Sequence, residues 1–326
     1  MALDKTILEI PVARRRFRRL LLKWFDQNKR DLPWRVSRDP YRVWLSEIML
    51  QQTRVAAAID HYRKFLRRFP TLVHLARARE SSVLTAWSGL GYYRRARMLH
   101  AAAREIVKDH AGRFPQTAEQ LRKLPGIGRY TAAAIASIAF GEPTAVVDGN
   151  VERVLQRIAG KNLSGELLWQ AAEELLDQAR PGDFNQAMME LGAVLCLPRQ
   201  PKCSLCPVHA LCATRGEHAR SAPAKRQRKR EIHYALTVRR NQVLLVQRPS
   251  GAALMPGMWE LPEISPNGAR PWLTVRHSIT TNDYSVRVFK DTAAAQNGQW
   301  ISCSRIPRLP LTGLARKVLR AAGIIY

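Results

Sequence analysis

Four closely spaced cysteines restrict the possible folds of this chain more than any other feature. Cys196, Cys203, Cys206 and Cys212 form a C-x6-C-x2-C-x5-C array in one short segment. Four thiolates in such a loop suit a zinc ion or a cubane iron–sulfur cluster, whereas unliganded thiols seldom bunch so tightly. The array also differs from the dispersed cysteines of secreted disulfide scaffolds. We therefore expect a metal-binding loop over 196–212 and a reducing compartment.

Length and charge indicate two domains and a polyanionic partner. The 326 residues exceed one typical core, and 53 Lys and Arg against 26 Asp and Glu leave a net charge of +27. Nucleic acid is the natural partner for that charge. No apolar run approaches the roughly 20 residues that cross a bilayer. Residues 13–22 mix arginine with leucine and phenylalanine, so no secretion signal is expected.

The periodicity of apolar residues changes once along the chain. From Phe17 to about Cys212 it is helical, which predicts an all-α domain over 1–215. Helices are expected at 39–54, 71–78, 81–87 and from 91 toward 110. Residues 216–231 are poor in apolar residues and contain a basic run, which is typical of a solvated linker.

Residues 232–326 change to an alternating pattern that predicts a smaller α+β domain. A hairpin is expected from strands 234–238 and 242–246 around a turn at 239–241. Further strands are predicted at 284–289 and 299–302, followed by a helix at 314–322.

The segment Leu124–Thr131 reads as the turn of a helix-hairpin-helix over 117–140. Gly126 and Gly128 permit a tight turn that exposes backbone N–H groups to a DNA phosphate. The alternative is an ordinary turn between two helices.

Two carboxylates are candidates for acid chemistry. Asp148 lies twenty residues after Gly128, where it is either catalytic or simply the N-cap of a following helix. Glu47 is the one carboxylate of the mostly apolar helical stretch 44–53. Buried there, it would stay protonated near neutrality, as a general acid must, but lone helix glutamates are more often exposed.

Several separated motifs together resemble one family. They are Leu32-Pro33-Trp34-Arg35, 46–53, Gly89-Leu90-Gly91-Tyr92-Tyr93, the hairpin, Asp148-Gly149-Asn150, Phe184-Asn185-Gln186-Ala187 and the cysteine array. In this order, across residues 32–212, they look like the MutY adenine DNA glycosylases of the helix-hairpin-helix, or endonuclease III, superfamily. The resemblance implies an all-α glycosylase domain with an iron–sulfur cluster loop, followed by a smaller α+β Nudix-like domain.

The resemblance assigns catalytic roles. Glu47 would protonate adenine at N7, and Asp148 would stabilise the oxocarbenium ion of the sugar or bond to it transiently. Asn150 and Tyr130 would hold these carboxylates. Bifunctional relatives carry a Schiff-base lysine at the position of Tyr130, so the chain is expected to be monofunctional, without efficient strand cleavage.

The resemblance also assigns binding residues. Arg35 and Gln186 match residues that hold the flipped adenine, and Gln52 and Tyr92 match residues that wedge into the space it leaves. The four cysteines would hold a [4Fe-4S] cluster. The implied partner of a monomeric protein is double-stranded DNA containing a mispair, in the cytoplasm at the nucleoid, or in the nucleus of a eukaryote.

The second domain resembles the Nudix-like domain with which this family reads 8-oxoguanine opposite adenine. Gln247-Arg248-Pro249 and 257–262 match its early strands, but the glutamate-rich helix that binds magnesium is missing from 263–275, so no pyrophosphohydrolase activity is expected. The family's Phe-Ser-His loop is replaced by Ile279-Thr280-Thr281, in which Thr280 keeps a hydroxyl. Whether 8-oxoguanine is preferred over guanine stays open.

Two other functions compete with adenine excision. A related glycosylase that removes thymine opposite guanine would share the hairpin, the aspartate and the cluster. A non-catalytic DNA-binding protein with a structural cluster would use the charge and the hairpin equally well. Glu47 together with Gln186 favours adenine, and the presence of both carboxylates favours an enzyme.

Overall fold

The computed structural model describes residues 7–216, 228–252, 254–265, 268–279, 282–290 and 298–325. The chain divides into two compact units. The first comprises the described residues of 1–63, 71–73 and 101–222, and the second those of 64–70, 74–100 and 223–326.

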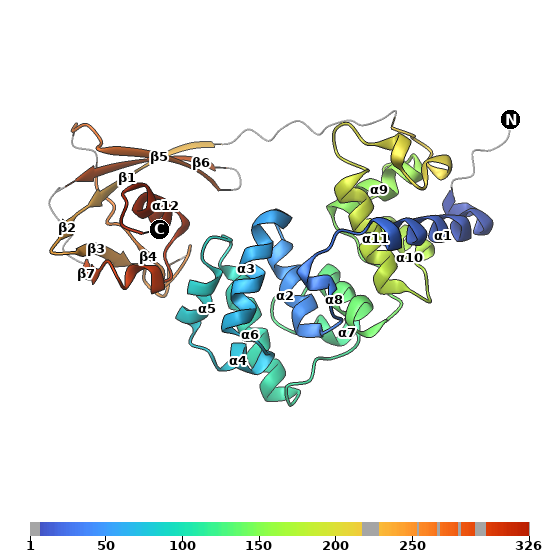
Figure 1. Cartoon of the computed structure of the whole chain (residues 1–326), viewed down its shortest axis with the longest axis horizontal. Helices are drawn as coiled ribbons and strands as arrows, with labels where there is room; N and C mark the ends of the chain where they lie inside the picture. Colours follow the sequence, from blue (N-terminus) through green and yellow to red (C-terminus); the bar gives the residue numbers. More distant parts are fainter. Residues whose placement is uncertain are drawn as a thin grey trace. The chain divides into compact units, whose positions relative to one another are not determined.

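The helices labelled in Figure 1 account for all regular structure in the described residues 7–216, which confirms the predicted helical first part. They are α1 (Pro11–Asn28), α2 (Pro40–Leu50), α3 (Val55–Arg68), α4 (Leu72–Arg77), α5 (Glu80–Trp87), α6 (Arg94–Asp109), α7 (Ala118–Leu121), α8 (Arg129–Ile135), α9 (Gly149–Ala159), α10 (Gly165–Leu175) and α11 (Pro181–Val194). Short helical turns lie at Ile7–Glu9, Pro33–Arg35 (η2), Ala136–Phe140 (η3), Cys203–Leu205 (η4) and His209–Leu211 (η5). None of the described helices is long and apolar enough to cross a membrane.

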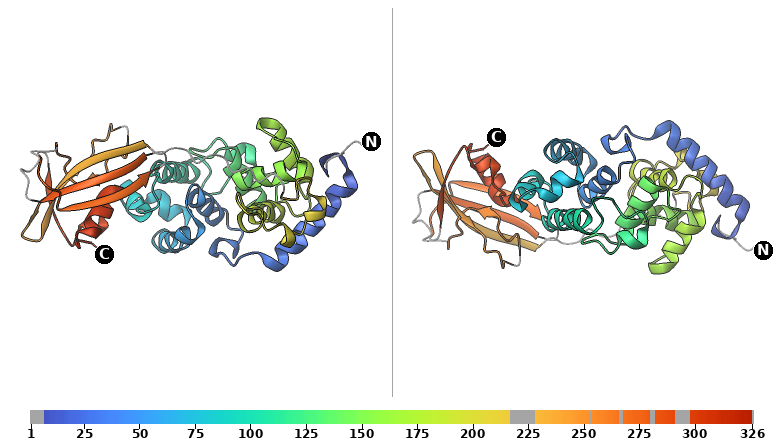
Figure 2. Two further views of the ribbon diagram at one scale, coloured as in Figure 1. Left: turned by 90° about the horizontal axis from the view of Figure 1, so that it is seen from above. Right: turned by 90° about the horizontal axis from the view of Figure 1, so that it is seen from below.

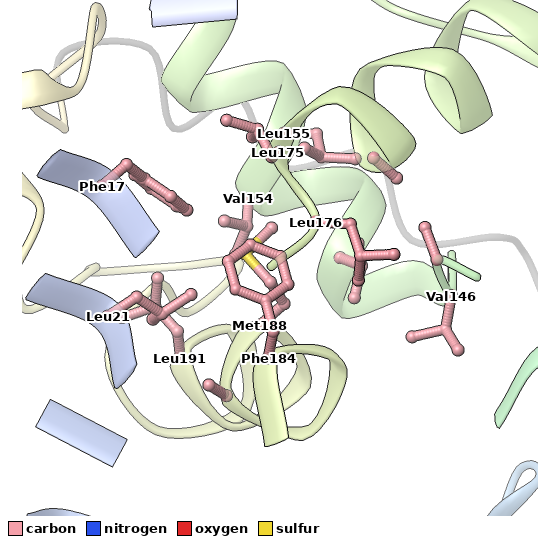
Figure 3. Packing of buried hydrophobic residues seen from close by; sticks show 14 of the residues in the cluster. Phe17, Leu21, Val146, Val154, Leu155, Leu175, Leu176, Phe184, Met188 and Leu191 are labelled. Carbon is pink, nitrogen blue, oxygen red and sulfur yellow. The ribbon is translucent and has the colours of Figure 1, made fainter. Parts of the chain in front are cut away.

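One core of the first unit lies among α1, α9, α10 and α11 (Figure 3). Phe17 and Leu21 are one turn apart on α1, so both face this core. Helices α9 and α11 pack closely at Gly192. A Cβ placed on this residue would lie 2.6 Å from the Cβ of Asn150, which is closer than two such atoms can approach. Only glycine allows this separation, and the contact sets the start of α9 against α11.

The predicted helix-hairpin-helix consists of α7, a turn and α8. The Thr117 hydroxyl caps α7 by accepting a hydrogen bond from Gln120 N at 3.3 Å. Gly126 has φ +74°, a left-handed conformation that favours glycine. Gly128 is the N-cap of α8.

The second unit contains two small sheets and α12 (Gly313–Ala321), around one core. Strands β1 (Arg228–Leu236), β6 (Asn282–Lys290) and β5 (Leu273–Ile279) form the first sheet, in which β1 and β6 are parallel. Strands β2 (Val238–Arg239), β3 (Gln242–Gln247), β4 (Trp259–Glu260) and β7 (Gln299–Ser302) form the second. Helix α12, red in both views of Figure 2, packs against the core through Leu314 and Val318. A smaller mixed domain at the C-terminal end is therefore confirmed.

Residues 74–100 group with the C-terminal residues because their side chains bond to them. The Tyr93 hydroxyl donates to Leu311 O at 3.0 Å, and the Thr85 hydroxyl donates to Arg308 O at 3.1 Å. The predicted domain boundaries at residues 215 and 232 do not coincide with the limits of these two units, and they remain a prediction.

The predicted hairpin is shorter than expected. Of the residues before the turn, only Val238 and Arg239, which form β2, pair with β3 as a hairpin around Arg240 and Asn241, whose φ values of +46° and +62° are typical of a two-residue type I′ turn. Residues 234–236 belong instead to β1, which pairs with the distant β6. An alternating pattern shows that a strand forms but does not identify its partner.

Several predicted boundaries are also corrected. Helix α2 ends at Leu50 rather than Arg54, since Gln52 takes a positive φ of +58°. Helix α6 begins at Arg94, after the left-handed Gly91 and Tyr92. Residues 228–231 of the predicted linker are the exposed start of β1. The sequence did not reveal this, because an exposed and basic strand end has the same composition as a linker. Residues 217–227 lie outside the described chain.

We predict that Gly192→Ala lowers the free energy of unfolding by about 1–3 kcal/mol, because α9 and α11 must move apart to admit a methyl group. Urea denaturation measures the change. Gly149→Ala is the control, since a Cβ there meets no atom within 4 Å. Equal stability of the two variants would contradict the packing argument.

Candidate active site

Glu47 lies in the interior of the first unit, with 6% of its surface exposed. Helix α2 carries it there, because its neighbours Ser46 and Ile48 and the residues one turn earlier, Val43 and Trp44, are also buried. The helix starts at a sharp cap, where the Asp39 carboxylate accepts from Arg42 N at 2.9 Å. The expectation of a buried carboxylate is confirmed, and the alternative of an exposed one is wrong.

The surroundings of Glu47 favour its protonated form. Burial, the largest effect, and the nearby Asp148 carboxylate raise its pKa, while a Tyr130 hydrogen bond and the Arg35 charge lower it, and the net result is a pKa of about 7. The Tyr130 hydroxyl donates to Glu47 Oε2 at 2.5 Å. Burial together with the two carboxylates holds the pKa of Tyr130 well above its usual value, so Tyr130 remains a donor.

Asp148 is the N-cap of α9, and it also faces the same cavity as Glu47. Its Oδ1 accepts from Asn150 N at 2.9 Å and from Val151 N at 2.8 Å, and its Oδ2 accepts from Asn150 Nδ2 at 3.0 Å. The two interpretations of this aspartate are therefore compatible. Capping fixes the carboxylate at the positive end of the helix dipole.

Asn150 is itself held in place by Arg153. Arg153 Nη2 donates to Asn150 Oδ1 and to Gly192 O, both at 2.8 Å, and its Nε donates to Cys196 O at 2.8 Å. One guanidinium thus connects the carboxamide beside Asp148 with α11 and with the first cysteine of the array.

One cavity of about 580 Å³ brings the predicted site together. Its volume lies within the range of small-ligand pockets. It is lined by seven of the eight residues predicted for catalysis or base binding: Arg35, Glu47, Gln52, Tyr130, Asp148, Asn150 and Gln186. Because these residues come from five separate segments of the chain, the fold itself creates the site.

The other predicted residues lie outside this cavity. Tyr92 belongs to the second unit, where its side chain is 41% exposed and the Arg95 guanidinium lies 5.4 Å from its ring centroid. Gly126 and Gly128 are in the hairpin turn. Thr280 lies outside the described residues.

Sequence reasoning missed Glu190 on α11, which lines the cavity with only 1% of its side chain exposed. Its Oε1 accepts from Arg30 Nε at 2.7 Å and from Arg30 N at 3.1 Å, and its Oε2 accepts from Arg30 Nη2 at 2.8 Å and Arg35 Nη2 at 2.9 Å. Burial raises its pKa, but these bonds outweigh burial and lower the pKa to about 2. The signal that indicated Glu47, a carboxylate in an apolar helix, also applies to Glu190.

The four cysteines lie near one another, at the end of α11 and around η4 and η5. Burial and, to a smaller extent, the other three thiols raise the pKa of Cys206 to about 11, against the lowering effect of a backbone hydrogen bond from Val208. Arg157 Nη1 donates to Cys196 Sγ at 3.3 Å, and Cys212 Sγ lies 3.4 Å from Arg157 O. In the described part of the chain, no three His, Cys, Asp or Glu side chains converge tightly enough to bind a single metal ion.

We predict that Glu47 destabilises the fold as the pH rises. Its folded pKa of about 7 exceeds the ordinary 4.5, so its contribution to stability is complete below about pH 4.5 and is lost as pH rises through 7. The wild-type protein should therefore lose free energy of unfolding between pH 5 and pH 8 through this group. Glu47→Gln should lose roughly 3 kcal/mol less than the wild type over the same range. Urea denaturation at both pH values tests this, with the half-exposed Glu174→Gln as control. The same pH dependence in all three proteins would contradict it.

Comparison with known proteins gives consistent results. Residues 45–177 match the model of the HhH-GPD superfamily of base excision DNA repair proteins. The chain is 52% identical to human adenine DNA glycosylase over 214 residues, covering 61% of this chain and 39% of the human protein. It is 40% identical to adenine DNA glycosylase of Arabidopsis thaliana over 321 residues, covering 83% of this chain and 50% of the plant protein. The chain thus spans half or less of the length of these relatives.

Solved structures agree with this match. A thermostable thymine-DNA glycosylase is 33% identical with a TM-score of 0.59, and the similarity covers 63% of this chain and 97% of that protein. An endonuclease III–DNA covalent intermediate, 23% identical with a TM-score of 0.55, covers 64% of this chain and 99% of that protein and shows the shared fold. The chain belongs to the HhH-GPD superfamily of base excision DNA repair proteins.

Proposed function

We propose that this protein is a monofunctional DNA glycosylase that hydrolyses the N-glycosidic bond of adenine mispaired with 8-oxoguanine or guanine. The observation that carries the proposal is the presence of two carboxylates in different environments in one cavity of about 580 Å³. Glu47 is buried with a pKa of about 7, whereas Asp148 accepts three hydrogen bonds, as an ionised carboxylate does.

The two environments support two roles. Protonated Glu47 donates to a ring nitrogen of the flipped adenine, so that the base departs as a neutral molecule. Asp148, held by Asn150, stabilises the positive charge that develops on the sugar as the bond to the base breaks. Water then adds to the sugar and gives one proton to the Glu47 carboxylate, which restores the acid. Tyr130 carries a hydroxyl rather than an amine and cannot form a Schiff base, which supports hydrolysis without strand cleavage.

Arg35 and Gln186 lie together at the wall of the cavity, where they suit contacts to the flipped base. Arg35 Nε donates to Gln186 Oε1 at 3.3 Å. Gln52 and Tyr92, the proposed wedges, are two of the eight non-glycine residues with positive φ in the described chain. Such conformations are strained and persist where the surrounding structure holds them.

The hairpin and the net charge support binding to double-stranded DNA. A Cβ at Gly128 would meet no protein atom within 4 Å, and the φ of Gly128 is an ordinary −87°. Packing within the protein therefore does not require glycine at this position. Close approach of a DNA phosphate to the N-terminus of α8 would require it, because a side chain would occupy that space. Gly126 supplies the turn. We expect the protein to act as a monomer where chromosomal DNA lies, in a bacterial cytoplasm or a eukaryotic nucleus.

Adenine is favoured over thymine by the comparisons. The identity to the adenine-specific relatives is 52% over 214 residues, against 33% to the thymine-DNA glycosylase. The buried acid is the second reason, because adenine leaves more readily after protonation of a ring nitrogen. A non-catalytic DNA-binding protein would not need to bury an acid beside a second carboxylate.

We propose that Cys196, Cys203, Cys206 and Cys212 hold a [4Fe-4S] cluster over 196–212. Cys206 lies close enough to the other three thiols for each of them to raise its pKa, and four cysteine thiolates are the ligand set of such a cluster. The Arg157 guanidinium beside Cys196 suits a cluster with negative charge. Bound there, the cluster would hold the loop folded.

We also propose a first domain over 1–215 and a second domain that starts with β1 at Arg228, with the second domain a Nudix-like reader of the opposite base. The motif residues Gln247 and Trp259 face each other across the paired strands β3 and β4. Thr280 would supply a hydroxyl to 8-oxoguanine.

We predict that the protein excises adenine from duplexes with adenine opposite 8-oxoguanine or guanine, and not thymine opposite guanine. Glu47→Gln should lower the single-turnover rate by at least about 10²-fold, because it lacks the acid, while DNA binding by gel shift stays unchanged. Glu174→Gln, on an exposed pair with Arg14, is the control. Excision of thymine alone, or an unaffected rate in Glu47→Gln, would refute the proposal.

We predict four iron atoms and four labile sulfides per chain, measured by metal and sulfide analysis of the purified protein. Cys203→Ser should lose iron, whereas Cys303→Ser, outside the array, should retain it. One zinc atom per chain in place of iron would overturn the cluster assignment.

A further inference from the structure

The Glu190 carboxylate is the centre of a closed hydrogen-bond network at the wall of the cavity. It lies on α11, and its two oxygens accept four bonds from Arg30 and Arg35. Arg35 Nη1 donates in addition to Arg30 O at 3.1 Å. Glu190 thereby fixes the plane and the position of the Arg35 guanidinium.

The position of Arg35 determines the orientation of the Gln186 amide. A guanidinium Nε can only donate, so the atom 3.3 Å away must be the amide oxygen of Gln186. The NH2 group of the same amide is then the end left to donate to a ligand in the cavity that Gln186 lines. This NH2 group would suit a base that presents an acceptor nitrogen at that point better than one that presents an N–H group.

The same network determines the charge near Glu47. The titratable and charged side chains around this cavity are Arg30, Arg35, Glu47, Tyr130, Asp148 and Glu190. The Arg35 charge lowers the pKa of Glu47. The ionised Glu190, 2.9 Å from Arg35 Nη2, offsets that charge, so removing Glu190 leaves Arg35 as an unbalanced cation beside the acid.

We propose that Glu190 is a positioning residue of this cavity: through Arg35 it orients the Gln186 amide toward the base and balances the positive charge beside Glu47. The statement about the base rests on the proposed function. The statement about Glu47 does not, because it concerns the protein without DNA.

The test is a titration of the Glu47 carboxyl carbon by 13C NMR in the full chain without DNA, with its signal assigned by its loss in Glu47→Gln. In Glu190→Gln, which keeps the shape but not the charge, the pKa of Glu47 should fall by on the order of one pH unit. Glu190→Asp keeps the charge and should restore the wild-type titration. Glu174→Gln is the control on an exposed ion pair.

Arg35→Met separates the two charges. It should raise the pKa of Glu47, because the cation is gone while the ionised Glu190 remains. Adding Glu190→Gln to Arg35→Met should then lower the pKa again, because each charge acts on Glu47 independently of the other. An unchanged Glu47 titration in folded Glu190→Gln would overturn the proposal. If Glu190→Gln does not fold, the double variant decides: a pKa below that of Arg35→Met supports the proposal, and an equal one overturns it.

Excision assays add a second readout. In Glu190→Gln, the fall of the single-turnover rate with rising pH should move to lower pH, because less of Glu47 stays protonated. A merely structural role would lower the rate equally at every pH, and that result would overturn the proposal. If the wild-type protein excises no base, the proposed function fails, while the NMR titration still decides the role of Glu190.

Discussion

The burial of Glu47 is the constraint on which the rest of the site depends. A carboxylate removed from water keeps its proton to higher pH, and here the Asp148 carboxylate in the same cavity adds to this effect. Tyr130 and Arg35 oppose it without overcoming it. The result is an acid with a pKa of about 7, poised where a proton donor is most effective.

The scaffold that holds the second carboxylate depends on a close helix contact. Gly192 lets α11 lie against the start of α9, and Arg153 crosses the contact to bond Asn150, Gly192 and Cys196. The carboxylate cap, the helix pair and the cysteine segment are therefore one connected structure. We infer that a cluster held by that segment would help to support the position of Asp148.

The cavity combines opposite charges in a small volume. Arg30 and Arg35 bring two cations to its wall, and Glu190 accepts hydrogen bonds from both. Glu190 thus offsets one of the two positive charges, so Glu47 does not lie beside two unopposed cations. Inside the cavity, positive and negative side chains lie together. The whole chain, in contrast, carries an excess of basic residues, and this excess suits binding to the DNA backbone.

Local signals in the sequence predicted much of this protein. The Asp39 and Thr117 caps, the Gly126 turn and the cysteine array act over a few residues, so they can be recognised without knowing the fold. The motifs of the resemblance added the candidate residues, and seven of the eight expected at the base site line one cavity.

The sequence alone determined the helical and mixed parts and the chemistry of the candidate residues, because periodicity and residue type are local properties. Only the tertiary structure decided that Glu47 is buried, that Asp148 is both a cap and a cavity residue, and that Glu190 joins Arg30 and Arg35. The same is true of the parallel pairing of β1 with β6. Burial and pairing depend on segments distant along the chain, and no local pattern records which segments will meet.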